Sequence, residues 1–81
     1  MLLNTPIKVL VVDDSLVFGR FLTSNLPKAN SRIQIVGYAA NAYEAIEKIP
    51  QCAPDVITMD VEMPKMNGIE FLKQVMPKHP I

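Results

Sequence analysis

The sequence predicts an α/β fold of three layers, in which helices cover both faces of a parallel sheet. Short, β-branched apolar runs alternate with segments whose apolar residues recur at helical spacing, and only short connections join them. This alternation implies right-handed crossovers between parallel strands. A chain of 81 residues has the length of one small domain, and we assign residues 1–81 to it.

The first unit of this fold spans residues 7–29. Residues 7–12 read IKVLVV, a nearly continuous apolar run that is typical of a strand buried on both faces. We expect a helix to follow, capped by Asp14 or Ser15 and ended by Pro27. The apolar residues that share one face of this helix are Phe18, Phe21, Leu22 and Leu26.

The second unit begins with a strand over residues 33–39. Asn41 and Glu44 have the spacing of a capping box, which predicts a helix from this point. Pro50 is expected to end that helix.

The third unit is predicted to hold a short strand over residues 56–59 and a helix over residues 69–76. A loop containing Pro64 and the Asn67-Gly68 pair separates the two. The helical residues expected to face the core are Leu72, Val75 and Met76.

Composition excludes several classes of protein. Eight basic residues balance eight acidic ones, so neither a nucleic-acid-binding surface nor a polybasic membrane anchor is indicated. No apolar run approaches the roughly 20 residues that a membrane-spanning helix needs. The single Cys52 excludes an internal disulfide framework and suits the cytoplasm.

Carboxylates follow two of the predicted strands. Asp13 and Asp14 come directly after the first strand, and Asp60 follows the third. With the strand order second, first, third, these acids would meet where ligands bind in parallel α/β sheets. Such a cluster is costly to ionise without a cation, and oxygen ligands of this kind suit Mg²⁺. Taken alone, Asp14 could simply be a helix cap. Asp60 precedes a loop, so capping does not explain it. Together the three acids favour a metal or phosphate site.

Two stretches of the chain resemble the receiver domains of bacterial response regulators. They are VLVVDDS at residues 9–15 and PDVITMDVEMPKMNGIEFL at residues 54–72. The resemblance covers essentially the whole chain and implies a flavodoxin-like fold. The residues around Asp60 are most similar to the receiver of the chemotaxis protein-glutamate methylesterases.

The resemblance also implies a role for each acid. Asp60 would accept a phosphoryl group from a sensor histidine kinase, Asp14 would bind Mg²⁺ directly, and Asp13 would bind it through water. The backbone carbonyl of Glu62 would be a further metal ligand. Gly68 would help to shape the turn that aims this carbonyl, since glycine suits a left-handed backbone.

The family pattern has five strands, of which these 81 residues match the first three. The Ser or Thr after the fourth strand, the Lys after the fifth and the aromatic residue on the fifth have no counterpart here. We therefore expect a truncated receiver that keeps the acidic pocket but is phosphorylated slowly or not at all. We expect no methylesterase activity, because the chain contains no G-x-S-x-G motif.

Two further interpretations stay open. The third strand would present an unpaired edge, so we expect two copies to associate through this strand or through the C-terminal segment. The alternative to a phosphoacceptor is therefore a structural or interaction fragment without phosphotransfer. A phosphatase with an aspartate nucleophile, using Glu62 as its second acid, fits the sequence less well.

Overall fold

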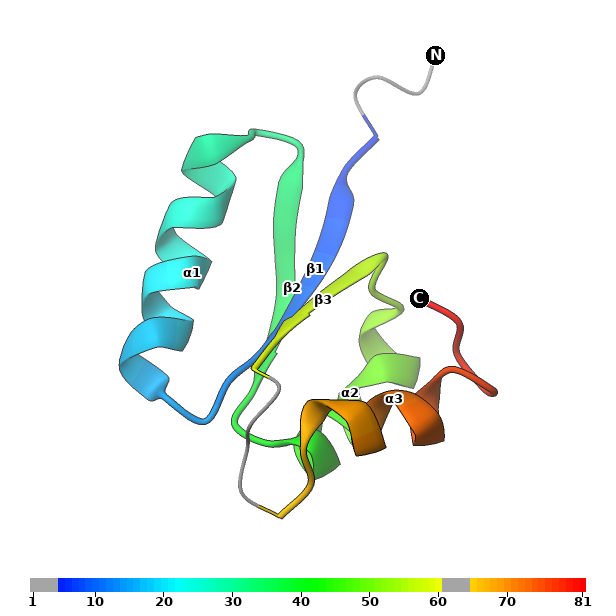
Figure 1. The fold of residues 1–81 in the computed structure, drawn as a ribbon. Coiled ribbons are helices and arrows are strands. Elements are labelled where there is room, and N and C mark those ends of the chain that lie inside the picture. The colour runs from blue at the N-terminus through cyan, green and yellow to red at the C-terminus, as the bar shows by residue number, and fades with distance from the viewer. Residues whose placement is uncertain (1–4, 61–64) are drawn as a thin grey trace.

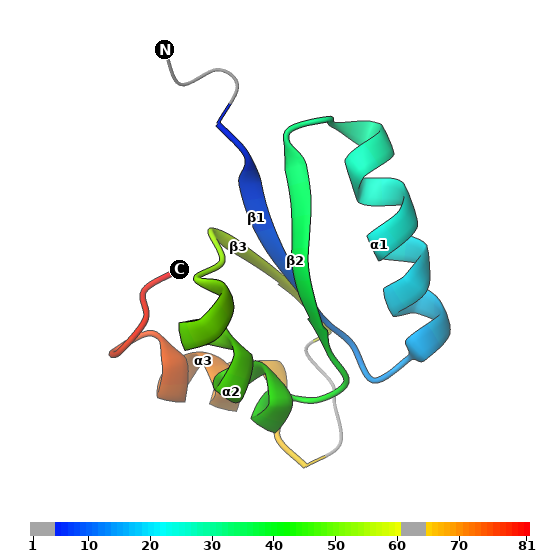
Figure 2. The same cartoon turned by 180° about the vertical axis from the view of Figure 1, so that it is seen from behind.

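The computed structural model describes residues 5–60 and 65–81, and within these ranges three strands alternate with three helices. The elements are β1 (Ile7–Val12), α1 (Leu16–Ala29), β2 (Ile33–Ala39), α2 (Ala42–Cys52), β3 (Val56–Met59) and α3 (Gly68–Val75). The strands form one parallel sheet of order β2-β1-β3. Helix α1 covers one face of the sheet and helices α2 and α3 cover the other (Figures 1 and 2). The predicted three-layer fold and strand order are confirmed.

Strand β1 is the centre of the sheet and its last four residues are buried. At its carboxyl end Val12 pairs with Ala39 of β2 and with Met59 of β3. The loops that leave β1 and β3 therefore start side by side. None of the helices in the described ranges is long and apolar enough to cross a membrane.

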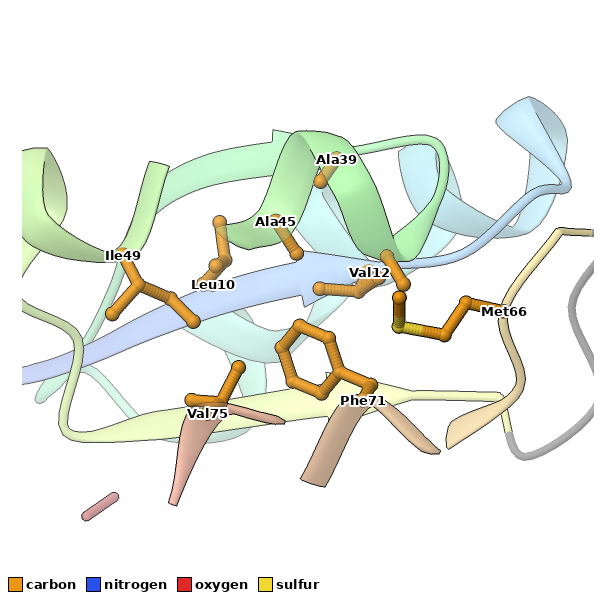
Figure 3. Packing of buried hydrophobic residues seen from close by; sticks show 9 residues of the cluster. Leu10, Val12, Ala39, Ala45, Ile49, Met66, Phe71 and Val75 are labelled. Atoms are coloured by element: carbon orange, nitrogen blue, oxygen red, sulfur yellow. The ribbon is translucent and has the colours of Figure 1, made fainter. Parts of the chain in front are cut away.

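The hydrophobic core lies between the sheet and the pair α2 and α3 (Figure 3). Phe71 of α3 is fully buried, and its ring points toward the side chains of β1. The buried residues of this cluster are Leu10, Val12, Ala39, Ala42, Ala45, Ile49, Met66, Phe71 and Val75. The apolar side chains of β1 and the two helices thus hold the carboxyl end of the sheet together.

Polar side chains cap the start of each helix. The Ser15 hydroxyl accepts a hydrogen bond from the Phe18 N–H at 3.2 Å. The side chains of Asn41 and Asn67 accept from the backbone three residues later, at 3.0 and 2.9 Å. These bonds satisfy N–H groups that have no partner inside the helix. Of the two predicted caps for α1, Ser15 is the one that forms.

Proline does not end α1 or α2, contrary to our expectation. Pro27 and Pro50 both lie inside the last turn, and each helix continues for two residues beyond its proline. A proline so near the carboxyl end removes only one helical hydrogen bond. Helix α2 ends at Cys52, and the next residue, Ala53, forms the cap with a left-handed backbone (φ 46°).

The buried faces of α1 and α3 also differ from the expected ones. On α3, Val75 is buried and Met76 packs against the core as expected, whereas Leu72 is 40% exposed. Phe71, which the spacing did not indicate, is buried instead. On α1 only Gly19 is buried, while Phe18 and Phe21 are exposed and stack on each other. Helical spacing identifies residues that share a face, but tertiary packing decides which part of that face meets the sheet.

Candidate functional site: an acidic pocket at the carboxyl end of the sheet

Three carboxylates converge at the neighbouring carboxyl ends of β1 and β3. Asp13 and Asp14 follow β1, and Asp60 follows β3. Each of the three offers an oxygen, and these oxygens lie within 4.8 Å of one another. The sheet order explains the convergence, because β1 and β3 are parallel neighbours whose carboxyl ends meet.

The three acids differ in burial. Asp13 is only 6% exposed, and its Oδ1 accepts a hydrogen bond from the Ser15 N–H at 2.8 Å. This bond fixes the side chain and leaves the other carboxylate oxygen for a ligand. Asp14 and Asp60 are exposed and can therefore meet a ligand from solvent.

The acids line a cavity of about 340 Å³ between the sheet and α1. Phe18 and Leu22 of α1 contribute apolar walls, and Thr58 of β3 contributes a hydroxyl. The Thr58 Oγ1 atom is buried without a hydrogen-bond partner in the described part of the chain. Three carboxylates and a hydroxyl without a partner form an all-oxygen donor set, which fits a hydrated Mg²⁺ ion. No lysine or arginine is among the described residues that line the cavity.

Of the two other predicted site residues, only Gly68 lies within the part of the chain that the structure describes. Glu62, whose backbone carbonyl was predicted as a metal ligand, lies outside the described residues. Gly68 does not have a left-handed backbone; it is the buried first residue of α3. The left-handed residue on this side of the loop is Lys65, with φ 76°. The turn thus occurs earlier in the chain, and Gly68 is already helical.

Tyr38 of β2 is a neighbour of the site that the sequence did not single out. Its hydroxyl donates a hydrogen bond to the backbone carbonyl of Asp13 at 2.6 Å. Burial, together with the negative charges of Asp13, Glu44 and Asp14, raises the pKa of the Tyr38 hydroxyl above its usual value. The one sequence signal was Gly19, a glycine inside the helical pattern of α1, which lies against the Tyr38 ring.

Comparisons with known proteins agree with this geometry. The family model of the response regulator receiver domain matches residues 9–80. A protein-glutamate methylesterase/protein-glutamine glutaminase of Vibrio vulnificus is 46% identical over 99% of this chain, and one of Geobacillus kaustophilus is 51% identical over 93%. The chain spans 23% and 21% of the length of these two relatives.

Solved structures give the same picture. The response regulator domain of Thermotoga maritima CheB is 48% identical and superposes with a TM-score of 0.80, over 93% of this chain and 55% of that one. A CheX-CheY complex of Borrelia burgdorferi with BeF3 and Mg²⁺ contains a chain that is 34% identical, with a TM-score of 0.71. That match covers 90% of this chain and 55% of the other.

Proposed function

Because this chain belongs to the family of response regulator receiver domains, we propose that it is the phosphoacceptor module of a two-component or chemotaxis signalling protein in the cytoplasm. The observation that supports this function is the convergence of Asp13, Asp14 and Asp60 in one cavity. We propose Asp60 as the phosphoacceptor and a sensor histidine kinase as its phosphoryl donor. Methylesterase chemistry is not assigned to residues 1–81, which contain no G-x-S-x-G motif.

The proposed reaction is the transfer of one phosphoryl group to a carboxylate. An Asp60 oxygen attacks the phosphorus, a P–O bond forms, and the bond from phosphorus to the donor breaks, leaving its electron pair on the donor. A Mg²⁺ ion, when bound, supplies positive charge to the phosphoryl oxygens. The relative found in a complex with BeF3 and Mg²⁺ supports this assignment.

Each acid has a separate task in this proposal. Asp14 is exposed and would bind the ion directly. Asp13, fixed by Ser15, would bind it through water. The backbone carbonyl of Glu62 is proposed as a further ligand. Thr58 would offer its hydroxyl to a water of the ion.

Phosphorylation by acetyl phosphate tests the function. With Mg²⁺ present, we expect the chain to gain the mass of one phosphoryl group, and we expect Asp60→Asn to gain none. Asp55→Asn is the matched control. Asp55 directly precedes β3, at the end of the strand away from Asp60, and its side chain accepts a hydrogen bond from the Lys8 N–H. Intact-mass spectrometry measures the gain. A gain that persists in Asp60→Asn, or one that does not need Mg²⁺, contradicts the proposal.

The rate of this reaction is expected to be low. Neither lysine nor arginine is among the described residues lining the cavity, so only the metal would offset the charge of the phosphoryl group beside three carboxylates. Under identical conditions we expect slower phosphorylation than in the Thermotoga maritima CheB receiver. An equal rate would show that cationic side chains at this cavity are not needed.

A second candidate function is self-association through β3, and an apolar groove favours it. Within the described residues, β3 pairs only with β1, and its other edge borders a cavity of about 430 Å³ beside α3. The apolar residues lining this groove are Val56, Ile57, Met59, Phe71, Leu72, Met76 and Ile81. Unpaired strand edges of this kind are prone to pair with another chain.

We propose a second copy of this chain as the occupant of the groove. A two-fold axis would place two β3 strands antiparallel, so that each satisfies the free backbone groups of the other. Asp55 is the one ionisable residue in the described lining, and it lies before the start of β3. Antiparallel pairing places the two Asp55 side chains at opposite ends, which avoids repulsion between like charges.

A charged residue on this edge is expected to abolish the dimer. Val56 is 43% exposed, so Val56→Lys adds a charge to the strand edge without emptying the core. The control is Val17→Lys on α1, at a position that is 81% exposed and outside the groove. Sedimentation equilibrium at high micromolar concentration should give dimers for the parent chain and the control, and monomers for Val56→Lys. A folded, monomeric parent chain would refute self-association.

A further inference from the structure

We propose that Tyr38 is a positioning residue for the acidic pocket, acting through the backbone of Asp13. The inference rests on the proposed function, because it concerns how well the pocket binds Mg²⁺. Tyr38 does not line the pocket cavity, and it contacts the site through the peptide that joins two of the acids.

The peptide group between Asp13 and Asp14 determines how these two side chains diverge. Its carbonyl oxygen is the acceptor of the Tyr38 hydroxyl, at 2.6 Å. The peptide on the other side of Asp13 is also held, because the Asp13 N–H donates to the Ala39 carbonyl at 3.0 Å. Both peptides of Asp13 are therefore bound to the end of β2. Without the hydroxyl, the Asp13–Asp14 peptide loses the bond that fixes its plane.

Tyr38 is itself held in place by two other elements. The ammonium group of Lys48 on α2 donates a hydrogen bond to the Tyr38 carbonyl. On the opposite side the ring packs against Gly19 of α1. A Cβ atom at position 19 would lie 2.4 Å from Cε1 of the ring, which is closer than such contacts occur.

Gly19 thus explains why the tyrosine can reach the acidic loop. Glycine weakens a helix interior, and α1 tolerates it at its one buried position. The missing side chain leaves the space that the Tyr38 ring occupies. We infer that Gly19 and Tyr38 act as a pair, in which the glycine provides the space and the tyrosine provides the hydrogen bond.

Tyr38→Phe tests the hydroxyl, because it keeps the ring and removes only the donor. We expect the Mg²⁺ dissociation constant to rise about threefold to tenfold, the range that corresponds to one hydrogen bond. The probe is Mg²⁺ alone, and the readout is the amide chemical shifts of Asp13, Asp14 and Asp60 during titration. Tyr43→Phe is the matched control on α2, where the tyrosine is exposed; its dissociation constant should equal that of the parent chain.

Thermal unfolding without Mg²⁺ separates positioning from stability. The titrations are run well below the unfolding midpoints of all variants, so a change in affinity cannot come from unfolded protein. Equal dissociation constants for the parent chain and Tyr38→Phe would overturn the inference, even if the midpoint fell. If the parent chain itself bound no Mg²⁺, the proposed function would fail together with this inference.

A second pair of variants tests the packing. Gly19→Ala is expected to lower the unfolding midpoint in the parent chain, because the new methyl group meets the ring. In a Tyr38→Ala background the same change should raise the midpoint, since the ring is gone and alanine favours the helix. A decrease of equal size in both backgrounds would show that Gly19 and Tyr38 are not coupled.

Discussion

Phe71→Ala is expected to lower the free energy of unfolding by about 3–5 kcal/mol. The ring is 0% exposed, and it lies in the cluster that joins β1, α2 and α3. Removing it deletes buried apolar surface and leaves a cavity that the surrounding side chains fill only in part. A chain of 81 residues has a total stability of roughly 4–12 kcal/mol at the usual value per residue. At the lower end of this range, the substitution removes most of the stability and should leave much of the protein unfolded.

Leu72→Ala is the matched control for Phe71→Ala. It removes an apolar side chain from the next position of the same helix, where the residue is 40% exposed and borders the β3 groove. At protein concentrations low enough to keep the chain monomeric, we expect a decrease of about 1 kcal/mol or less, because little Leu72 surface is withdrawn from water in the single chain. Urea denaturation followed by circular dichroism measures both changes. Equal losses for the two variants would contradict the placement of Phe71 as the centre of the core.

The sequence predicts the fold of this chain well because its signals are local and agree with one another. The apolar run of β1, the Asn41 cap and the alternation of strands with helices all indicate the same parallel sheet. The convergence of Asp13, Asp14 and Asp60 follows from strand order alone. Neighbouring parallel strands must bring their carboxyl ends together, so Asp60 could be expected beside the Asp13-Asp14 pair despite its distance in the sequence.

The sequence does not predict properties that depend on packing between elements. The spacing of α3 suggested Leu72 as a core residue, but the rotation of the helix on the sheet points Phe71 inward instead. Glycine lowers helix propensity, so Gly19 taken alone only weakens α1. The space that it leaves for the Tyr38 ring can be seen only once β2 packs against that helix. Residue spacing determines a helix face, whereas contacts across elements depend on distances that spacing does not contain.

Asp14→Asn is expected to reverse the order of stabilities when Mg²⁺ is added. Without divalent cations, the variant should be at least as stable as the parent chain, by up to about 1 kcal/mol. It removes repulsion among carboxylates whose oxygens lie within 4.8 Å, and the exposure of Asp14 and Asp60 keeps that repulsion small. At a Mg²⁺ concentration 100 times the dissociation constant, the parent chain should gain about 2.7 kcal/mol. The variant, lacking the proposed direct ligand, should gain little.

Urea denaturation with and without Mg²⁺, at constant ionic strength, measures this reversal. Glu47→Gln removes one exposed acid from α2, and it should gain as much from Mg²⁺ as the parent chain does. The control separates binding in the pocket from general screening of negative charge. An equal gain in Asp14→Asn would place the cation elsewhere and would refute the metal site. A reversal in Asp14→Asn alone would mean that the same three carboxylates destabilise the metal-free fold and bind the ion that we propose for phosphoryl transfer to Asp60.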